Sequence, residues 1–97
     1  MIRHCVLLRV RDGATPDAVA ACVEALRALP ARIPEIRTYE VGTDLGWRDG
    51  NADIGIAATF DDEAGWRRYV EHPDHVAVIE EHIVPLVESR QSVQFTI

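Results

Sequence analysis

The sequence predicts an α+β domain in which one antiparallel sheet carries helices on a single face. Strand-like segments with alternating apolar residues and segments with apolar residues at helical spacing follow one another in the order β-α-β-β-α-β. The chain has 97 residues, of which 47% are hydrophobic and 27% charged, as in an ordinary globular protein. This length supports one two-layer core, so residues 1–97 are expected to form a single domain.

The first strand is expected over Ile2 to Val10, and the first helix from Pro16 to about Leu29. Thr15 is a good N-cap and proline is favoured at the first helical position. Pro30 and Pro34 follow the helix and end it. The covered face of this strand carries Ile2, His4, Val6, Leu8 and Val10, and its other face carries Arg3, Cys5, Leu7, Arg9 and Arg11.

Two further strands are expected over residues 36–43 and 52–60. Residues 44–51 between them are rich in turn-forming side chains, which predicts a loop whose Trp47 needs cover from elsewhere. The second of these strands alternates clearly. Its residues expected to face the helices are Ile54, Ile56, Ala58 and Phe60.

A second helix is expected to start at a cap formed by Asp61 or Asp62 and to run through Val70. Pro73 predicts a break, because proline lacks an amide hydrogen and disfavours helical geometry at the residue before it. A further helical segment is expected over residues 74–82, and Pro85 is expected to interrupt it.

The last strand is expected over residues 89–97, which completes a ferredoxin-like arrangement. Its side chains expected to face the helices are Val93, Phe95 and Ile97, with Ser92, Gln94 and Thr96 on the other face. The open face of the sheet would then hold Cys5 and Leu7 beside the small Gly55 and Ala57. Such a face suits packing against a second copy of the chain, so we expect a homodimer.

Composition argues against several classes of partner. The net charge of −6 disfavours nucleic acids, and no segment is typical of a signal peptide or a membrane span. Cys5 and Cys22 lack the spacing of a metal site or a disulfide framework, which indicates reduced thiols in a cytoplasmic protein. We therefore expect neither nucleic acid nor membrane as a partner, and no metal or other cofactor.

Residues 1–4, 30–39, 50–53 and 69–75 together resemble the stress-responsive dimeric α/β barrel (Dabb) family. The similarity spans nearly the whole chain, and its most specific element is the segment His72-Pro73-Asp74-His75 combined with His4. The resemblance implies a homodimer in which two sheets close into a barrel with the helices outside. It implies little about activity.

The family includes plant polyketide cyclases that form olivetolic acid. The resemblance implies that His4, Tyr69 and His75 occupy the positions of a histidine, a tyrosine and a second histidine of the cyclase pocket, which makes them the candidate catalytic residues. The chain departs from the cyclases at Ile54, which stands where they have another pocket histidine.

The residues themselves also favour a shared site, because His4 lies on the face that the helices carrying Tyr69 and His75 cover. An imidazole on an apolar face needs a hydrogen-bond partner. In the functional hypothesis, neutral His75 takes a proton, while His4 or the Tyr69 hydroxyl stabilises an oxyanion. In the alternative, the histidines bond each other or a backbone carbonyl and only complete the core.

His72 is expected to cap the broken helix or to lie exposed, with contact to a ligand as the further alternative, and Val6, Ile54 and Ile56 are expected to line the ligand site. A metal site at His72 and His75 is disfavoured, since imidazoles on either side of a proline lack a dependable shared face. Trp66 is expected in the core. Three functional hypotheses remain: a small-molecule binding protein or enzyme acting on a carbonyl or phenolic compound, a non-catalytic stress-associated structural dimer, and a haem- or quinol-type α/β barrel monooxygenase.

Overall fold

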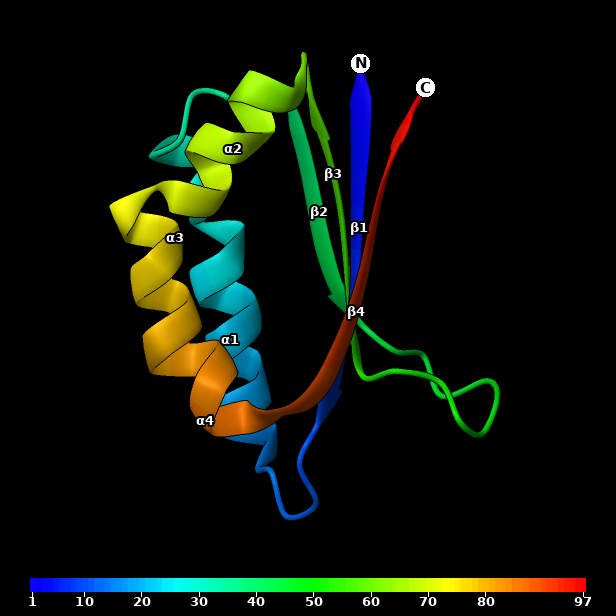
Figure 1. Ribbon diagram of the computed structural model, residues 1–97. Helices are drawn as coiled ribbons and strands as arrows, with labels where there is room; N and C mark the ends of the chain where they lie inside the picture. Colours follow the sequence, from blue (N-terminus) through cyan, green and yellow to red (C-terminus); the bar gives the residue numbers. More distant parts are fainter.

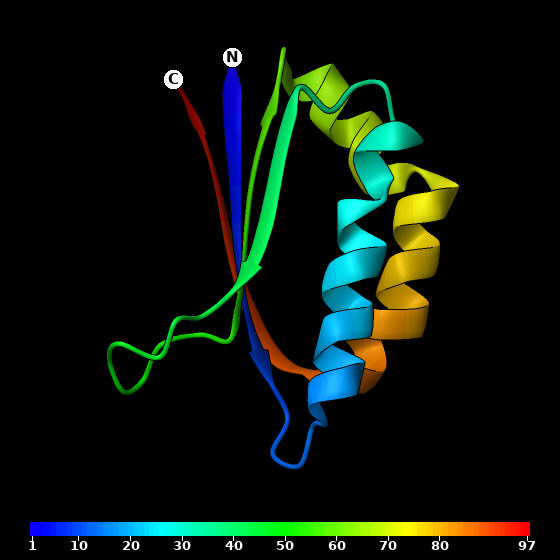
Figure 2. The same cartoon turned by 180° about the vertical axis from the view of Figure 1, so that it is seen from behind.

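The computed structural model describes all 97 residues. Its antiparallel sheet contains β1 (Ile2–Val10), β2 (Thr38–Thr43), β3 (Ile54–Phe60) and β4 (Val87–Thr96) in the order β2-β3-β1-β4. All helices lie on one face of this sheet (Figures 1 and 2). The predicted fold class and order of elements are confirmed.

Helix α1 (Pro16–Arg27) begins as predicted, with the Thr15 hydroxyl accepting a hydrogen bond from the Ala18 amide at 3.1 Å. It ends two residues earlier than expected, and the short 3₁₀ helix η1 (Leu29–Ala31) follows. Pro30 fits in the first turn of η1, where the backbone amides have no carbonyl partner within the helix. The side chains of α1 buried against the sheet are Cys22, Val23 and Leu26.

Helix α2 (Glu63–Glu71) is capped by Asp62, whose carboxylate accepts a hydrogen bond from the Gly65 amide at 2.9 Å. The chain breaks at His72, which takes the extended conformation that a following proline favours. Helix α3 (Pro73–Val78) then restarts with His72 as its N-cap, because Nδ1 of His72 accepts a hydrogen bond from the Asp74 amide at 3.1 Å. Both the predicted break and the capping role of His72 are confirmed.

The prediction that Pro85 interrupts the helix was wrong. Helix α3 continues through a π-helical turn, η2 (Ile79–Ile83), into α4 (Val84–Leu86), which contains the proline. In the π turn the Val84 amide pairs with the Ile79 carbonyl, five residues back. The wider turn shifts the hydrogen-bond register, so the chain continues past a residue that has no amide hydrogen.

The register of the sheet places His4 opposite Ala58 and Val6 opposite Ile56. Directly opposite residues of antiparallel strands share a face, so these side chains all lie under the helices. Strand β3 begins at Ile54 instead of Ala52, and β2 at Thr38 instead of Ile36. The core between sheet and helices consists of Val6, Leu8, Cys22, Val23, Leu26, Leu29, Ile33, Ile36, Val41, Ile54, Ile56, Ala58, Phe60, Tyr69 and Leu86.

The prediction for the faces of the last strand was also wrong. Gln94 lies opposite His4 and therefore on the helix side, whereas Val93 lies opposite Cys5 on the open face. Every residue of β4 after Val87 is exposed, because this edge strand lies beyond the reach of the helices. The polar side chains of β4 can thus face the helical layer and still contact water. Ser92, Gln94 and Thr96 occupy the helix side, and Val93 and Phe95 the open face.

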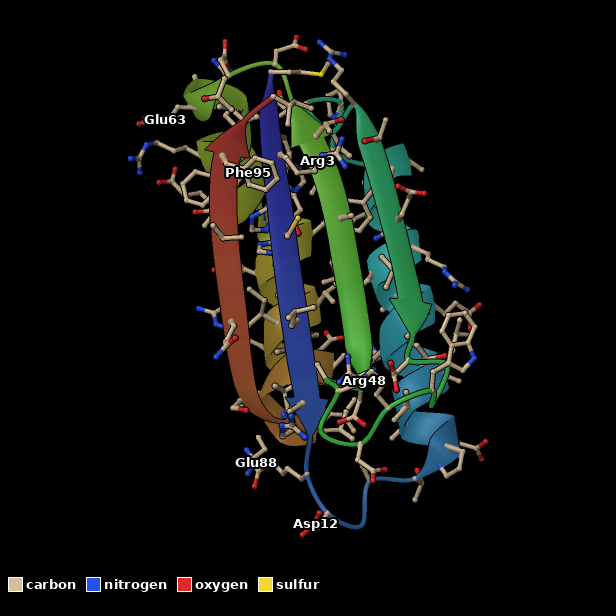
Figure 3. All side chains as sticks on the ribbon, turned by 90° about the vertical axis from the view of Figure 1, so that its right-hand side faces the viewer. Arg3, Asp12, Arg48, Glu63, Glu88 and Phe95 are labelled. Carbon is tan, nitrogen blue, oxygen red and sulfur yellow. The ribbon has the colours of Figure 1, made fainter.

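The open face of the sheet is partly apolar (Figure 3). Leu7, Val93 and Phe95 on this face are each about half exposed, at 51%, 54% and 48%. The predicted loop over residues 44–51 is confirmed, and it projects away from the helices beyond the open face (Figure 2). Trp47 in this loop is 83% exposed. No helix has the length and apolar character needed to span a membrane.

Candidate functional site

The three predicted catalytic residues lie together between the sheet and the helices. His4 comes from β1, Tyr69 from α2 and His75 from the first turn of α3, and Tyr69 lies between the two imidazoles. The Tyr69 ring centroid is 5.8 Å from that of His4 and 4.2 Å from that of His75. His4 and Tyr69 are only 6% and 2% exposed, whereas His75 is half-buried.

His4 accepts two hydrogen bonds at one ring nitrogen. The indole N–H of Trp66 and the amide of Gln94 both donate to its Nδ1, at 3.3 and 3.0 Å. An indole nitrogen can only donate, so Nδ1 of His4 carries no proton. The proton of the neutral ring is therefore on Nε2, and His4 presents a donor at that atom.

His75 has the opposite tautomer. Its Nδ1 lies 3.0 Å from the carbonyl oxygen of Val70, which can only accept, so Nδ1 carries the proton and Nε2 a lone pair. The break in the helix explains this contact: the Asp74 amide, which would pair with Val70 in a continuous helix, bonds to His72 instead. The carbonyl left free at the end of α2 then orients the His75 ring.

The Nε2 atoms of both imidazoles are free to meet a ligand. Neither forms a hydrogen bond within the chain. The Nε atom of Arg3 is the only fully buried side-chain nitrogen or oxygen without a partner, so both Nε2 atoms retain some contact with solvent.

The Tyr69 hydroxyl forms a 2.8 Å hydrogen bond with the hydroxyl of Tyr39 on β2. Burial raises the pKa of both phenols, and for Tyr39 the adjacent Tyr69 adds to this increase. The hydrogen bond partly opposes the increase at Tyr69. Both groups are therefore neutral hydroxyls near pH 7, and only one of the two protons occupies their shared hydrogen bond.

Burial and neighbouring positive charges keep both imidazoles neutral. Burial, followed by the charges of His75 and Arg90, lowers the pKa of His4 to about 4. Burial also lowers the pKa of His75, and the hydrogen bond to the Val70 carbonyl partly offsets this decrease. Near pH 7 the site thus combines a free base nitrogen with a neutral N–H donor.

Four main hollows mark the surface, and neither His4 nor His75 lines any of them. One of about 230 Å³ lies between α2 and β4, and its walls include Trp66 and Gln94, the two residues that bond to His4. The largest, of about 820 Å³, lies on the open face beside the 44–51 loop and is lined by Cys5, Leu7 and Trp47 among others. The hollow between α2 and β4 is the one that adjoins the histidine cluster, because two of its wall residues bond to His4.

The sequence model of the stress responsive A/B barrel domain (Dabb) matches residues 2–97. The chain belongs to this family. A dimeric ferredoxin-like protein of unknown function from Thermobifida fusca is 45% identical and has a TM-score of 0.91, over 99% of this chain and 90% of that one. An uncharacterized protein of Streptomyces coelicolor is 40% identical over 79 residues, which cover 79% of this chain and 81% of the relative.

An enzyme also has the fold of this Dabb protein. A hydroxynitrile lyase from Passiflora edulis is 21% identical, with a TM-score of 0.86 over 99% of this chain and 92% of that one. At this level of identity the likeness concerns the fold alone. The shared fold therefore assigns no activity to the Dabb chain.

The structure does not bring the predicted lining residues onto the cluster: Ile56 lies opposite Val6, and Ile54 lies opposite Leu8, four residues along β1 from His4. Val6, Ile54 and Ile56 are core residues with exposures of 9%, 1% and 7%, and the β3 neighbour of His4 is Ala58 instead of either isoleucine. His72 caps α3 and lies within 3.9 Å of the Asp74 carboxylate. A ligand-lining role for these four residues stays a prediction. No group of three or more His, Cys, Asp or Glu side chains in this Dabb chain is arranged to hold a metal ion.

Sequence reasoning missed three side chains that complete the cluster. Trp66 was assigned to the core, yet its indole bonds to His4, and it lies three residues before Tyr69 on the same face of α2. That spacing was the available signal. Gln94 was assigned to the open face, and only the register between β1 and β4 shows its contact with His4. Tyr39 was not singled out; it lies opposite Ala58 on the covered face, where its hydroxyl meets that of Tyr69.

Proposed function

We propose that this protein binds a small carbonyl or phenolic compound beside His4, Tyr69 and His75, and converts it by acid–base chemistry without a cofactor. One observation carries the proposal. The two neutral imidazoles have opposite tautomers, so His75 offers a lone pair at Nε2 and His4 offers a proton at Nε2, and neither atom is used inside the chain. A general base and an oxyanion donor require this combination.

The chemistry follows from these assignments. His75 Nε2 removes a proton from a carbon next to a carbonyl group, or from a phenol. The Nε2–H of His4 and the Tyr69 hydroxyl, with Tyr39 donating to Tyr69, stabilise the negative charge on oxygen. In an aldol-type cyclisation the enolate carbon attacks a second carbonyl carbon, and protonated His75 returns its proton to the new alkoxide. Proton and charge balance without an additional reactant.

The proposal includes a homodimer formed through the open faces of the sheets. Leu7, Val93 and Phe95 leave an apolar strip on this face, and Ala57 lies within it opposite Cys5. The Thermobifida fusca relative is described as dimeric. We also propose a cytoplasmic location, which fits the free thiols of both cysteines.

Light scattering tests the dimer. The wild-type protein is expected at twice the mass of the chain at micromolar concentration. Ala57→Arg places a charge in the strip and is expected to dissociate the dimer, whereas Ala20→Arg, on the exposed side of α1, leaves it intact. A monomeric wild-type protein would exclude the barrel arrangement.

The catalytic proposal is tested with the His75→Gln variant. Small carbonyl and phenolic compounds are first screened for thermal stabilisation of the wild-type protein, and turnover of the compounds that bind is then measured. Glutamine keeps a similar volume but cannot act as a base, so turnover is expected to fall about 10²- to 10⁴-fold. His82→Gln, outside the cluster, is the matched control and is expected to keep wild-type turnover.

Undiminished turnover by His75→Gln would refute the role of His75 as general base. The structural alternative would be favoured if no compound binds and His75→Gln destabilises the fold by several kcal/mol. The histidines would then only complete the hydrophobic core. Stability is therefore measured for both variants by urea unfolding.

A further inference from the structure

The open face of the sheet has two unlike halves. On the side of β1 and β4, Leu7 and Val93 are each about half exposed. On the side of β2 and β3 lies the hollow of about 820 Å³ beside the 44–51 loop. Gly42 and Gly55, which lie opposite each other, line this hollow without a side chain, and the space above them is open. One half of the face is therefore raised by apolar side chains, and the other half is recessed.

Two residues of opposite charge lie on this face, one in each half. Arg3 on β1 lies opposite Phe95 (Figure 3), and Glu40 on β2 lies opposite Ala57 and lines the hollow. Neither takes part in an ion pair within the chain. The two residues are separated by β3 and by two positions along the strands, so their backbones lie about 12 Å apart. Each charge is thus free to pair with a group outside the chain.

Arg3 differs from the other arginines that have no partner. Its Nε atom is fully buried and forms no hydrogen bond. The other arginines without a partner are exposed residues, which water can solvate: Arg32, Arg48, Arg68 and Arg90. A buried N–H group without an acceptor destabilises the structure that contains it. A carboxylate from outside the chain that draws the guanidinium away from this position removes that cost.

The shape of the open face favours one arrangement of two copies. Sheets that pack face to face keep their strands aligned to within about 30°. A two-fold axis parallel to the strands places β4 of each copy over β2 of the other, and β1 over β3. Leu7 and Val93 then fill the hollow of the partner. An axis across the strands would instead leave the two hollows facing each other, and interfaces pack as densely as protein interiors.

We propose that the homodimer packs with the β1–β4 half of each sheet over the β2–β3 half of the other, and that Arg3 pairs with Glu40 of the partner subunit. The inference rests on the homodimer proposed above and adds its arrangement and its ion pairs. Arg3 lies over β3 of the partner, next to the strand that carries Glu40. The filled hollow also covers two of its wall residues, Leu45 and Trp47, which are 71% and 83% exposed in the single chain.

Exchange of charge between the two positions tests the pairing. Arg3→Glu and Glu40→Arg each set two pairs of like charges against each other in a dimer of that variant alone. In an equimolar mixture, a mixed dimer pairs the reversed position 3 of one subunit with the reversed position 40 of the other. The two unchanged side chains also pair with each other, so opposite charges meet at both positions. Sedimentation velocity measures the dimer dissociation constant in each sample.

Each variant alone is expected to have a dissociation constant about 100-fold above the wild-type value, because like charges across an interface repel. The mixture is expected to return to within about tenfold of the wild type. Arg32→Glu and Glu80→Arg make the same changes of net charge at exposed positions beside η1 and in η2. These controls are expected to dimerise as the wild type does, both alone and mixed.

A mixture that dimerises no better than its two components, or single variants with wild-type dissociation constants, would overturn the pairing and leave the homodimer in place. If a single variant does not fold alone, both variants are unfolded in urea and refolded together. An unfolded or monomeric mixture would then overturn the pairing. A monomeric wild-type protein would exclude the homodimer together with this inference.

Discussion

Acid is expected to destabilise this protein through His4, and the substitution His4→Gln tests this expectation. His4 is 6% exposed, and its pKa in the folded chain is lowered to about 4 from an ordinary value of 6.5. Between these two pH values the unfolded chain binds a proton that the folded chain does not. Stability from neutral His4 is therefore fully present above pH 6.5 and is lost as the pH falls toward 4.

The magnitude follows from the two pKa values. A shift from 6.5 to about 4 corresponds to about 3 kcal/mol of unfolding free energy once the pH is below both values. Between pH 7 and pH 5 the same shift costs the folded state about 2 kcal/mol. Because His4 is almost fully buried, solvent does little to reduce this effect.

Urea unfolding at pH 7 and at pH 5, followed by tryptophan fluorescence, measures the effect. His4→Gln keeps an acceptor for the Trp66 indole but does not titrate. The stability advantage of wild type over His4→Gln is expected to shrink by about 2 kcal/mol between pH 7 and pH 5. Protein concentration is kept constant, since association would add a concentration-dependent contribution. His82→Gln shows the effect of removing a histidine elsewhere.

A stability difference between wild type and His4→Gln that does not change with pH would refute the reasoning. It would mean that His4 titrates alike in the folded and unfolded chain. NMR titration of the folded protein then measures the pKa of the His4 ring directly. A ring that titrates near 6.5 would contradict the burial of the imidazole.

Three further outcomes are expected from urea unfolding at pH 7. Tyr69→Phe removes the hydrogen bond to the half-buried Tyr39 hydroxyl and is expected to cost about 0.5–1.5 kcal/mol. The Tyr39→Phe/Tyr69→Phe double variant is expected to be non-additive, and additive effects would argue against this hydrogen bond. Asp62→Ala removes the cap of α2 and is expected to cost about 1 kcal/mol; unchanged stability would contradict the capping role. Leu8→Ala, at a residue 2% exposed, is expected to cost about 2–5 kcal/mol; a loss below 1 kcal/mol would argue against its burial.

Much of the fold could be predicted from short stretches of sequence. The alternation in β1 placed His4 and Cys5 on opposite faces of the strand. The capping residues Thr15 and Asp62 predicted the first residues of α1 and α2 to within one position. The break before Pro73 was predicted from proline's missing amide hydrogen. The convergence of His4, Tyr69 and His75 followed from which faces the elements present to one another.

The faces of β4 and the hydrogen bonds of the cluster depended on tertiary structure. Alternation identifies two faces of a strand but not which one meets the helices, and the register with β1 sent Val93 to the open side and Gln94 to His4. An edge strand that no helix covers has no need of an apolar inner face. The tautomers of His4 and His75 depend on donors and acceptors from other elements. Only the packed chain brings those groups within hydrogen-bonding distance.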